Sequence, residues 1–230
     1  MRGLGTLVNV ATVLVGTAIG VLGGRFVPER VRATVLSAVG LLVLALGVDN
    51  ALATHNFVFP LVSLVVGAVV GELLSLEERL EGLGRRLQGR REGRREASSF
   101  VEGFVSASLV FCVGPLTILG SISDGLGRGA EELIVKAALD GLVALVLAST
   151  LGIGVGFSAL VVLVVQGGLT LFAGAVEDVL SGRMVDEMTA TGGVMLLGIG
   201  LRLLEVRAVR VASLLPGLVV APVLVSLFAR

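Results

Sequence analysis

The chain has 230 residues, of which 55% are hydrophobic and 16% are charged, and its mean hydropathy is +1.01. A soluble domain is about a quarter charged, so this composition excludes an ordinary soluble protein and indicates a membrane protein. The 18 basic and 18 acidic residues cancel, which gives no electrostatic reason to expect a nucleic acid partner. The single cysteine, Cys112, excludes an intrachain disulfide bond and a multi-cysteine metal site.

Apolar runs recur along nearly the whole chain. A helix needs about 20 apolar residues to cross a bilayer, and runs of about this length predict an all-α polytopic transmembrane helix bundle of about eight spans, with the lipid bilayer as its surroundings. The expected spans are 4–24, 33–49, 57–75, 100–122, 133–153, 157–176, 189–204 and 211–229.

A long polar segment, 77–99, separates the third span from the fourth and holds seven of the 17 arginines. The positive-inside rule places this segment in the cytoplasm and both termini outside. Its leucines recur at spacings of three and four, which predicts an amphipathic helix that continues the third span and lies on lipid headgroups, packs on the bundle or forms a coiled coil. The predicted organisation is a three-helix unit (1–76), this linker (77–99) and a five-helix unit (100–230).

Two parts of the chain echo each other. "SAVGLLVLALGVDN" (37–50) resembles "TATGGVMLLGIGLR" (189–202), and 59–71 loosely resembles 212–224. The predicted topology runs these pairs in opposite directions, so spans 1–3 and 6–8 are candidates for an inverted repeat, a feature of transporters. Chance similarity among few apolar letters is the other interpretation.

Two spans contain their own helix breakers. Pro115 lies near the middle of the fourth span, in "FCVGPLTILGSISDG", and Pro216 lies in the eighth, in "LLPGLVVAP". A proline in hydrocarbon removes one backbone donor and displaces a carbonyl that needs another partner. One interpretation is a kink tolerated for packing; the other is a discontinuous helix whose freed backbone groups line a polar cavity.

One carboxylate is expected well inside a span. Asp140 is about seven residues into the fifth span, or roughly 10 Å deep at the helical rise. A charge at this depth is a candidate functional group by default. Lys136 precedes it by one turn, so a purely structural Lys136–Asp140 ion pair is the alternative.

Neutral polar residues accompany this carboxylate. Asn9 in the first span and Gln166 in the sixth are either neutral ligands or interhelical packing bonds. Ser108 and Thr117 in the fourth span carry hydroxyls within helical reach of Pro115. We therefore predict that these four residues line a polar pathway with Asp140, Lys136, Pro115 and Pro216.

Catalytic signatures are absent from the sequence. It contains no phosphate-binding loop, zinc-binding H-E-x-x-H helix or G-x-S-x-G nucleophile elbow. His55 is the only histidine and is expected in an external loop. We therefore expect no enzyme and no cofactor, while a metal bound through Asp124, Asp140 and an external acid stays open.

Several blocks together resemble a known family. They are "GTLVN", "GELLSLEERLEGLG", "FVEGFVSASLVFCVGPLTILGSISDGL", "KAALDGLVALVLASTLGIGVGFSA", "QGGLTLFAG" and "EMTATGGVMLLGIGLRLLE". The chain is similar over nearly its whole length to the YdfK/YqgA-like family of bacterial integral membrane proteins, a domain family of unknown function. The resemblance implies a multi-pass protein of the bacterial inner membrane and carries no known active site. The family pattern commonly has Asn where this chain has Ser213.

Taken together, these features favour a transporter or channel for a small ion or solute, and oxygen ligands favour a cation or a proton-coupled solute. The alternative is a non-transporting scaffold or sensor that acts through the arginine-rich segment 77–99 on anionic lipid or a cytoplasmic partner. The glycine-rich helix faces also suggest a homodimer.

Overall fold

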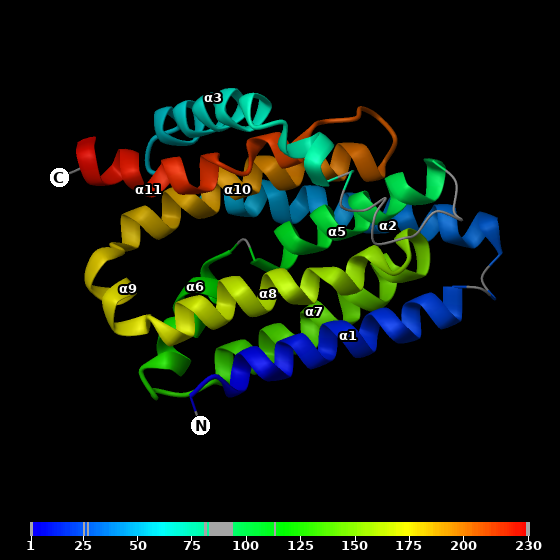
Figure 1. The fold of residues 1–230 in the computed structure, drawn as a ribbon, viewed down its shortest axis with the longest axis horizontal. Coiled ribbons are helices and arrows are strands. Elements are labelled where there is room, and N and C mark those ends of the chain that lie inside the picture. The colour runs from blue at the N-terminus through cyan, green and yellow to red at the C-terminus, as the bar shows by residue number, and fades with distance from the viewer. Residues whose placement is uncertain are drawn as a thin grey trace. The chain divides into compact units, whose positions relative to one another are not determined.

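The computed structural model describes residues 2–24, 26, 28–80, 82, 94–112 and 114–228. Within these ranges the chain is helical and has no strand. Figure 1 shows the elements α1 (Leu4–Gly24), α2 (Glu29–Ala51), α3 (Val58–Leu73), α5 (Arg94–Cys112), α6 (Pro115–Gly125), α7 (Glu131–Leu151), α8 (Gly154–Leu171), α9 (Ala173–Val179), α10 (Gly182–Leu203), the 3₁₀ helix η1 (Val211–Leu214) and α11 (Gly217–Phe228).

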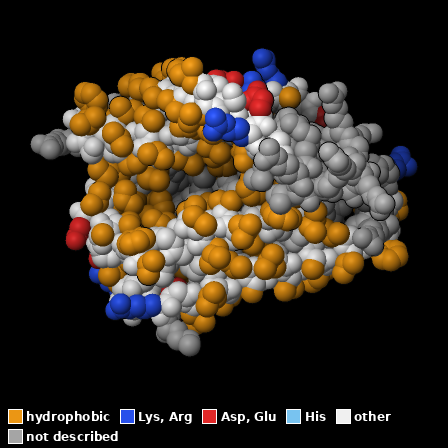
Figure 2. All heavy atoms as spheres, in the orientation of Figure 1, with side chains coloured by type: hydrophobic (Ala, Val, Ile, Leu, Met, Phe, Trp, Pro, Cys, Tyr) orange, Lys and Arg blue, Asp and Glu red, His pale blue; other side chains and the backbone are white. Residues whose placement is uncertain are grey.

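The helices are long and apolar, as the hydropathy predicts. Six described segments are long and apolar enough to cross a membrane, and the bent pair α5 and α6 makes a seventh if it is one span. The remaining predicted span corresponds to α3, which has only 16 residues. Apolar side chains cover most of the visible described surface in Figure 2, as expected for a protein whose solvent is lipid. The prediction of a helical membrane bundle of about eight spans is confirmed.

Packing divides the chain into two compact units. Unit 1 comprises Met1–Ser37 and Ser99–Val179, and unit 2 comprises Ala38–Ser98 and Leu180–Arg230. Each unit therefore takes residues from both halves of the sequence, whereas the predicted division followed the chain as 1–76, 77–99 and 100–230.

In unit 1, α1 and α7 lie against each other along their lengths. Gly16, Gly20 and Gly24 of α1 face the backbone of Gly141, Leu145 and Ser149 of α7. Residue numbers rise together in these three contacts, so the two helices run in the same direction. Small residues at a spacing of four let the backbones approach, which is how helices associate where lipid supplies no hydrophobic drive.

Helix α8 also packs on α1, and it runs in the opposite direction to α1. The hydroxyls of Thr6 and Thr170 lie 3.4 Å apart, and Gly156 faces Thr17. Since α1 and α7 are parallel, an odd number of spans must separate them, and α2, α3 and the bent pair α5–α6 make three. If only one of α3 and the bent pair crossed the membrane, α7 would run antiparallel to α1, so the directions require that both cross or that neither does.

In unit 2, glycines again mark the close contacts. Gly40 of α2 faces Leu203, and Gly47 faces Gly193 of α10, so α2 and α10 are antiparallel. Helix α3 likewise runs antiparallel to η1 and α11, because Gly67 faces Gly217 and Gly71 faces Ser213.

These pairs have the pattern that an inverted repeat produces. The first residues of α2 and α10, and those of α3 and η1, are separated by the same 153 positions (182 − 29 and 211 − 58), and α1 and α8 by 150 (154 − 4). Each of α1, α2 and α3 packs antiparallel on its counterpart within one unit. The two echoing stretches therefore lie on helices that pack antiparallel, α2 on α10 and α3 on η1 and α11.

The predicted break at Pro115 is present, and the chain around Pro216 changes helix type without a sharp bend. Helix α5 ends at Cys112, α6 begins at Pro115, and the two axes differ by 62°. Gly114, between them, has φ +147°, which a side chain would disfavour. In unit 2 the 3₁₀ helix η1 ends at Leu214 and passes through a turn at Leu215 and Pro216 into α11, and Val211–Phe228 remains one candidate span.

Two boundaries differ from expectation. Helix α3 ends at Leu73, and Ser75 has φ +50°, so the third span does not continue straight into 77–99. Helix α10 begins at Gly182 instead of 189, because Ser181 caps it by accepting a hydrogen bond from Met184 N. Glu187, expected in an external loop, therefore lies inside α10.

Candidate functional site

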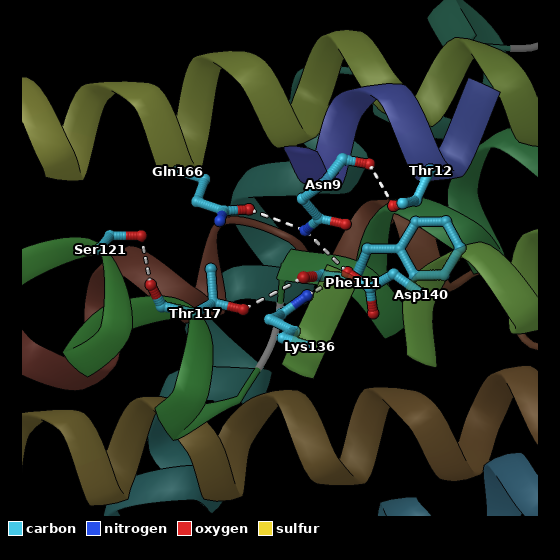
Figure 3. A network of polar contacts seen from close by, with 8 residues as sticks. All are labelled: Asn9, Thr12, Phe111, Thr117, Ser121, Lys136, Asp140 and Gln166. Carbon is cyan, nitrogen blue, oxygen red and sulfur yellow. Dashed lines mark hydrogen bonds and ion pairs between the residues drawn. The ribbon is translucent and has the colours of Figure 1, made fainter. Parts of the chain in front are cut away.

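The centre of unit 1 contains one buried carboxylate. Asp140 of α7 is only 6% exposed, and its Oδ2 accepts a hydrogen bond from Asn9 Nδ2 of α1 at 2.9 Å. The same oxygen forms an ion pair with the Lys136 ammonium, one turn earlier on α7 and 7% exposed. Figure 3 shows both donors pointing at this carboxylate.

Two amides extend the contact to a third helix. Asn9 Nδ2 also donates to Gln166 Oε1 of α8 at 2.9 Å, and both side chains are fully buried. The Asn9 nitrogen thus lies between two oxygens (Figure 3), which fixes the orientation of both amides. As a result Asn9 Oδ1 and Gln166 Nε2 have no hydrogen-bond partner among the described residues.

The break between α5 and α6 lies beside this network. Thr117 Oγ1 donates to the Phe111 carbonyl at 3.1 Å, and Ser121 Oγ donates to the Thr117 carbonyl (Figure 3). The Thr117 hydroxyl replaces the donor that Pro115 cannot supply to the Phe111 carbonyl, as a buried carbonyl in a membrane requires, whereas the Ser121 hydroxyl bonds back to a carbonyl within α6. Cys112, at the end of α5, is close enough to Lys136 and Asp140 for their charges to act on its thiol.

The structure brings most of the predicted pathway residues together. Asp140, Lys136, Asn9 and Gln166 form one contact network. Thr117 lies at the break, where α6 begins at Pro115. Ser108 of α5 has a buried hydroxyl without a hydrogen-bond partner in the described part of the chain. Pro216 lies in unit 2, so a pathway shared by Pro115 and Pro216 stays a prediction.

The Asp-Gly pair at 124–125 predicts a turn at the end of the fourth span, and the structure gives Asp124 a further contact at the start of α1. Its carboxylate is 2% exposed and accepts hydrogen bonds from Gly3 N at 3.2 Å and Gly5 N at 3.0 Å. The free amides at the start of α1 thereby receive an anionic cap. No group of three or more His, Cys, Asp or Glu side chains suited to a metal occurs among the described residues.

Unit 2 has two buried acids that the sequence did not single out. Glu187 is fully buried and accepts from Thr54 Oγ1 at 2.6 Å and from His55 N at 3.0 Å. Glu77 is 6% exposed and contacts Arg202 Nη1 at 3.2 Å and Ala212 N at 3.0 Å. Both partnerships join residues more than a hundred positions apart, so spacing along the chain gives no signal for them.

The arginine-rich segment 77–99 falls largely outside the described residues. Residues 76–80 are helical, and the described acids Glu72 and Glu78 both pair with Arg210. The predicted cytoplasmic position and lipid binding of the remaining arginines are not tested.

Comparison with known proteins gives a whole-chain match. Residues 4–226 match a family model described as "Protein of unknown function (DUF554)". The "Uncharacterized membrane protein YdfK" of Bacillus subtilis (strain 168) is 31% identical over 226 residues, which cover 96% of this chain and 95% of the relative. The "Uncharacterized protein YqgA" of Escherichia coli (strain K12) is 28% identical over 221 residues, with 95% and 94% of the two chains covered. No solved structure matches the chain.

Proposed function

Starting from the premise that this chain belongs to the DUF554 family and is a multi-pass membrane protein, we propose that it is a transporter or channel for a small cation or a proton-coupled solute. Asp140 is the charged member of its pathway, and Asn9, Gln166 and Thr117 are neutral ligands. The observation that carries the proposal is a buried carboxylate, held by a lysine and an amide, beside a broken helix.

The ion pair has little structural reason to exist. Lys136 and Asp140 lie on the same helix, so their contact joins no two helices. Burying two charges costs several kcal/mol for each ion, and apolar residues in their place are often as stable or more stable. The hydrogen bonds that reach from α1 to α7 and α8 at this point come from the Asn9 amide, and an amide needs no charged partner to make them. A pair that costs free energy without holding the fold favours a functional role.

The neighbouring break supplies what a permeating ion needs. Discontinuous helices in transporters expose backbone groups near the bilayer midplane, where they contact ions or solutes. The break at Gly114 gives α6 a free amino-terminal end and α5 a free carboxyl-terminal end next to the charged pair. Asn9 and Gln166 come from α1 and α8, which are counterparts in the repeat, and such interfaces hold transport sites in known folds.

The proposal also covers the location, topology and oligomeric state of the protein. The protein lies in the bacterial inner membrane, with 77–99 on the cytoplasmic side, and it catalyses no chemical reaction. A homodimer stays a prediction, and several glycines that suggested it already pack inside the two units.

Flux measurements test the assignment. Purified protein in liposomes is assayed for uptake of ²²Na⁺ and ⁸⁶Rb⁺ and for proton movement with an internal pH dye. Among the described residues of unit 1, Asp140 is the only buried acid besides Asp124, which caps α1. Asp140→Asn should therefore reduce flux to the rate of empty liposomes. Asp178→Asn on α9 makes the same change at an exposed carboxylate and should leave flux unchanged.

Two results contradict the proposal. One is transport by Asp140→Asn at the wild-type rate for each of the three ions. The other is an equal loss in Asp178→Asn, which would trace the effect to handling of the protein. Asp140→Glu keeps the charge and should retain part of the flux, which separates a transport defect from misfolding.

A further inference from the structure

The Lys136 ammonium occupies the position that a bound cation would take. It lies against Asp140 Oδ2 on α7, and Figure 3 shows it extending toward the end of α5, where Phe111 lies. Its partner is a carboxylate oxygen of Asp140, and the Phe111 carbonyl and the Thr117 hydroxyl bond to each other at the break toward which it extends. Hard cations prefer oxygen ligands of these kinds.

The network also has unused polar atoms. Asn9 Oδ1 belongs to a fully buried side chain, and it has no hydrogen-bond partner among the described residues. A buried oxygen without a partner costs free energy unless it accepts a hydrogen bond or binds a cation in another state of the protein. Asn9 donates through Nδ2 to Asp140, so the unpartnered oxygen belongs to the same amide that contacts the carboxylate.

We propose that the Lys136 ammonium is the resident cation of a monovalent-cation site at Asp140, and that an alkali-metal cation takes its place in exchange for one proton. The inference rests on the proposed function and names its substrate class and its coupling. A single carboxylate neutralises one monovalent ion, whereas a divalent ion needs further acids, and no cluster of three ligating side chains lies in the described residues.

Charge balance gives the exchange its stoichiometry. When the alkali cation binds Asp140, the displaced ammonium would be a buried charge without a counter-charge, which is very costly. Loss of its extra proton to water leaves a neutral amine, so the site carries no net charge before or after exchange. No bond other than this N–H bond breaks, and the reverse step takes one proton from water and releases the cation.

The other charged and titratable groups near the pair are few. Among the described residues, the exposed Glu132 lies one turn before Lys136 on α7, Cys112 ends α5, and α1 and α8 contribute the neutral amides Asn9 and Gln166. Lys136 is therefore the proton donor that the exchange requires.

Proton release on cation binding tests the proposal. Purified protein in detergent is titrated with NaCl or KCl in weakly buffered solution with a pH dye, with choline chloride at equal ionic strength as the reference. The wild-type protein should release about one proton for each cation bound. Lys136→Met should bind the cation more tightly and release none, and Asp140→Asn should neither bind nor release.

A second variant keeps the test decisive if Lys136→Met does not fold. Lys136→Arg retains the ion pair, but a guanidinium does not lose its proton in a protein. It should fold, release no proton and lose flux. Wild-type flux in Lys136→Arg, or cation binding by the wild-type protein without proton release, would overturn the exchange.

The experiments separate a failure of the cation–proton exchange from a failure of the proposed transport function. If flux depends on Asp140 but Lys136→Arg transports normally, the pathway stands and the lysine is only a structural partner. If Asp140→Asn also transports normally, the pathway itself is wrong.

Discussion

Removing the charge of Glu187 should destabilise unit 2 by more than the free energy of a single hydrogen bond. The carboxylate accepts from Thr54 Oγ1 and His55 N, and it is fully buried. In Glu187→Gln one oxygen becomes an amide nitrogen that faces a donor. A hydrogen bond to a charged group contributes about 1.5–3 kcal/mol, and an unsatisfied buried donor costs about 1–3 kcal/mol.

We therefore expect a loss of about 2–4 kcal/mol in the free energy of unfolding. For a chain of this length that corresponds to a decrease in Tm of roughly 5–15 °C. The assay is thermal unfolding in detergent, followed by circular dichroism. Glu177→Gln is the matched control, because Glu177 forms an exposed ion pair with Arg128 that contributes less than about 1 kcal/mol.

A double-mutant cycle sharpens the test. Thr54→Val removes one of the two donors, so it should cost less than Glu187→Gln, and the combined variant should cost less than the sum because both changes remove the same bond. A decrease in Tm for Glu187→Gln no larger than that for Glu177→Gln would refute the reasoning from burial.

Two further predictions concern the α1–α7 contact and the polar linker. Gly20→Val should cost about 1–3 kcal/mol and reduce flux, because a Cβ there would collide with the backbone carbonyl oxygen of Leu145 on α7 and lie 3.0 Å from Ala148 Cβ. Gly23→Val on the same helix meets nothing within 4 Å and should have no effect. Unfolding and uptake assays on both variants check this. Replacing 81–93 by a Gly-Ser linker of equal length should leave uptake unchanged in a transporter, and a loss would favour the scaffold hypothesis.

Hydropathy predicted the helices because the bilayer imposes a length on each span. It was least accurate where other forces set the boundary. The start of α10 depends on a Ser181 cap, and the acidic residues after it looked like a loop. Glu187 is tolerated inside that helix because donors from 54 and 55, far away in the sequence, satisfy it.

The candidate site was predictable to the extent that it is local. The spacing of Lys136 and Asp140 predicts their contact, since residues one turn apart share a helix face. That Asn9 and Gln166 reach the same point depends on which helices are neighbours, and hydropathy carries no information about neighbours. Asp124 was assigned to a turn because its contact with Gly3 and Gly5 depends in the same way on tertiary packing.

The three helices around the site contribute different kinds of side chain. Asn9 and Gln166 come from α1 and α8, which are equivalent members of the repeat and run in opposite directions, whereas Asp140 comes from α7, which lies outside it. The repeat thus supplies neutral amides from two helices, and the charge enters only once, on a helix that follows α1 closely through Gly16 and Gly20. In the proposed transport function, a single carboxylate bonded to Asn9, which in turn bonds to Gln166, suits an ion that must be released toward either side of the membrane. A second acid at the position of Gln166 would bind a cation more tightly and would make its release slower.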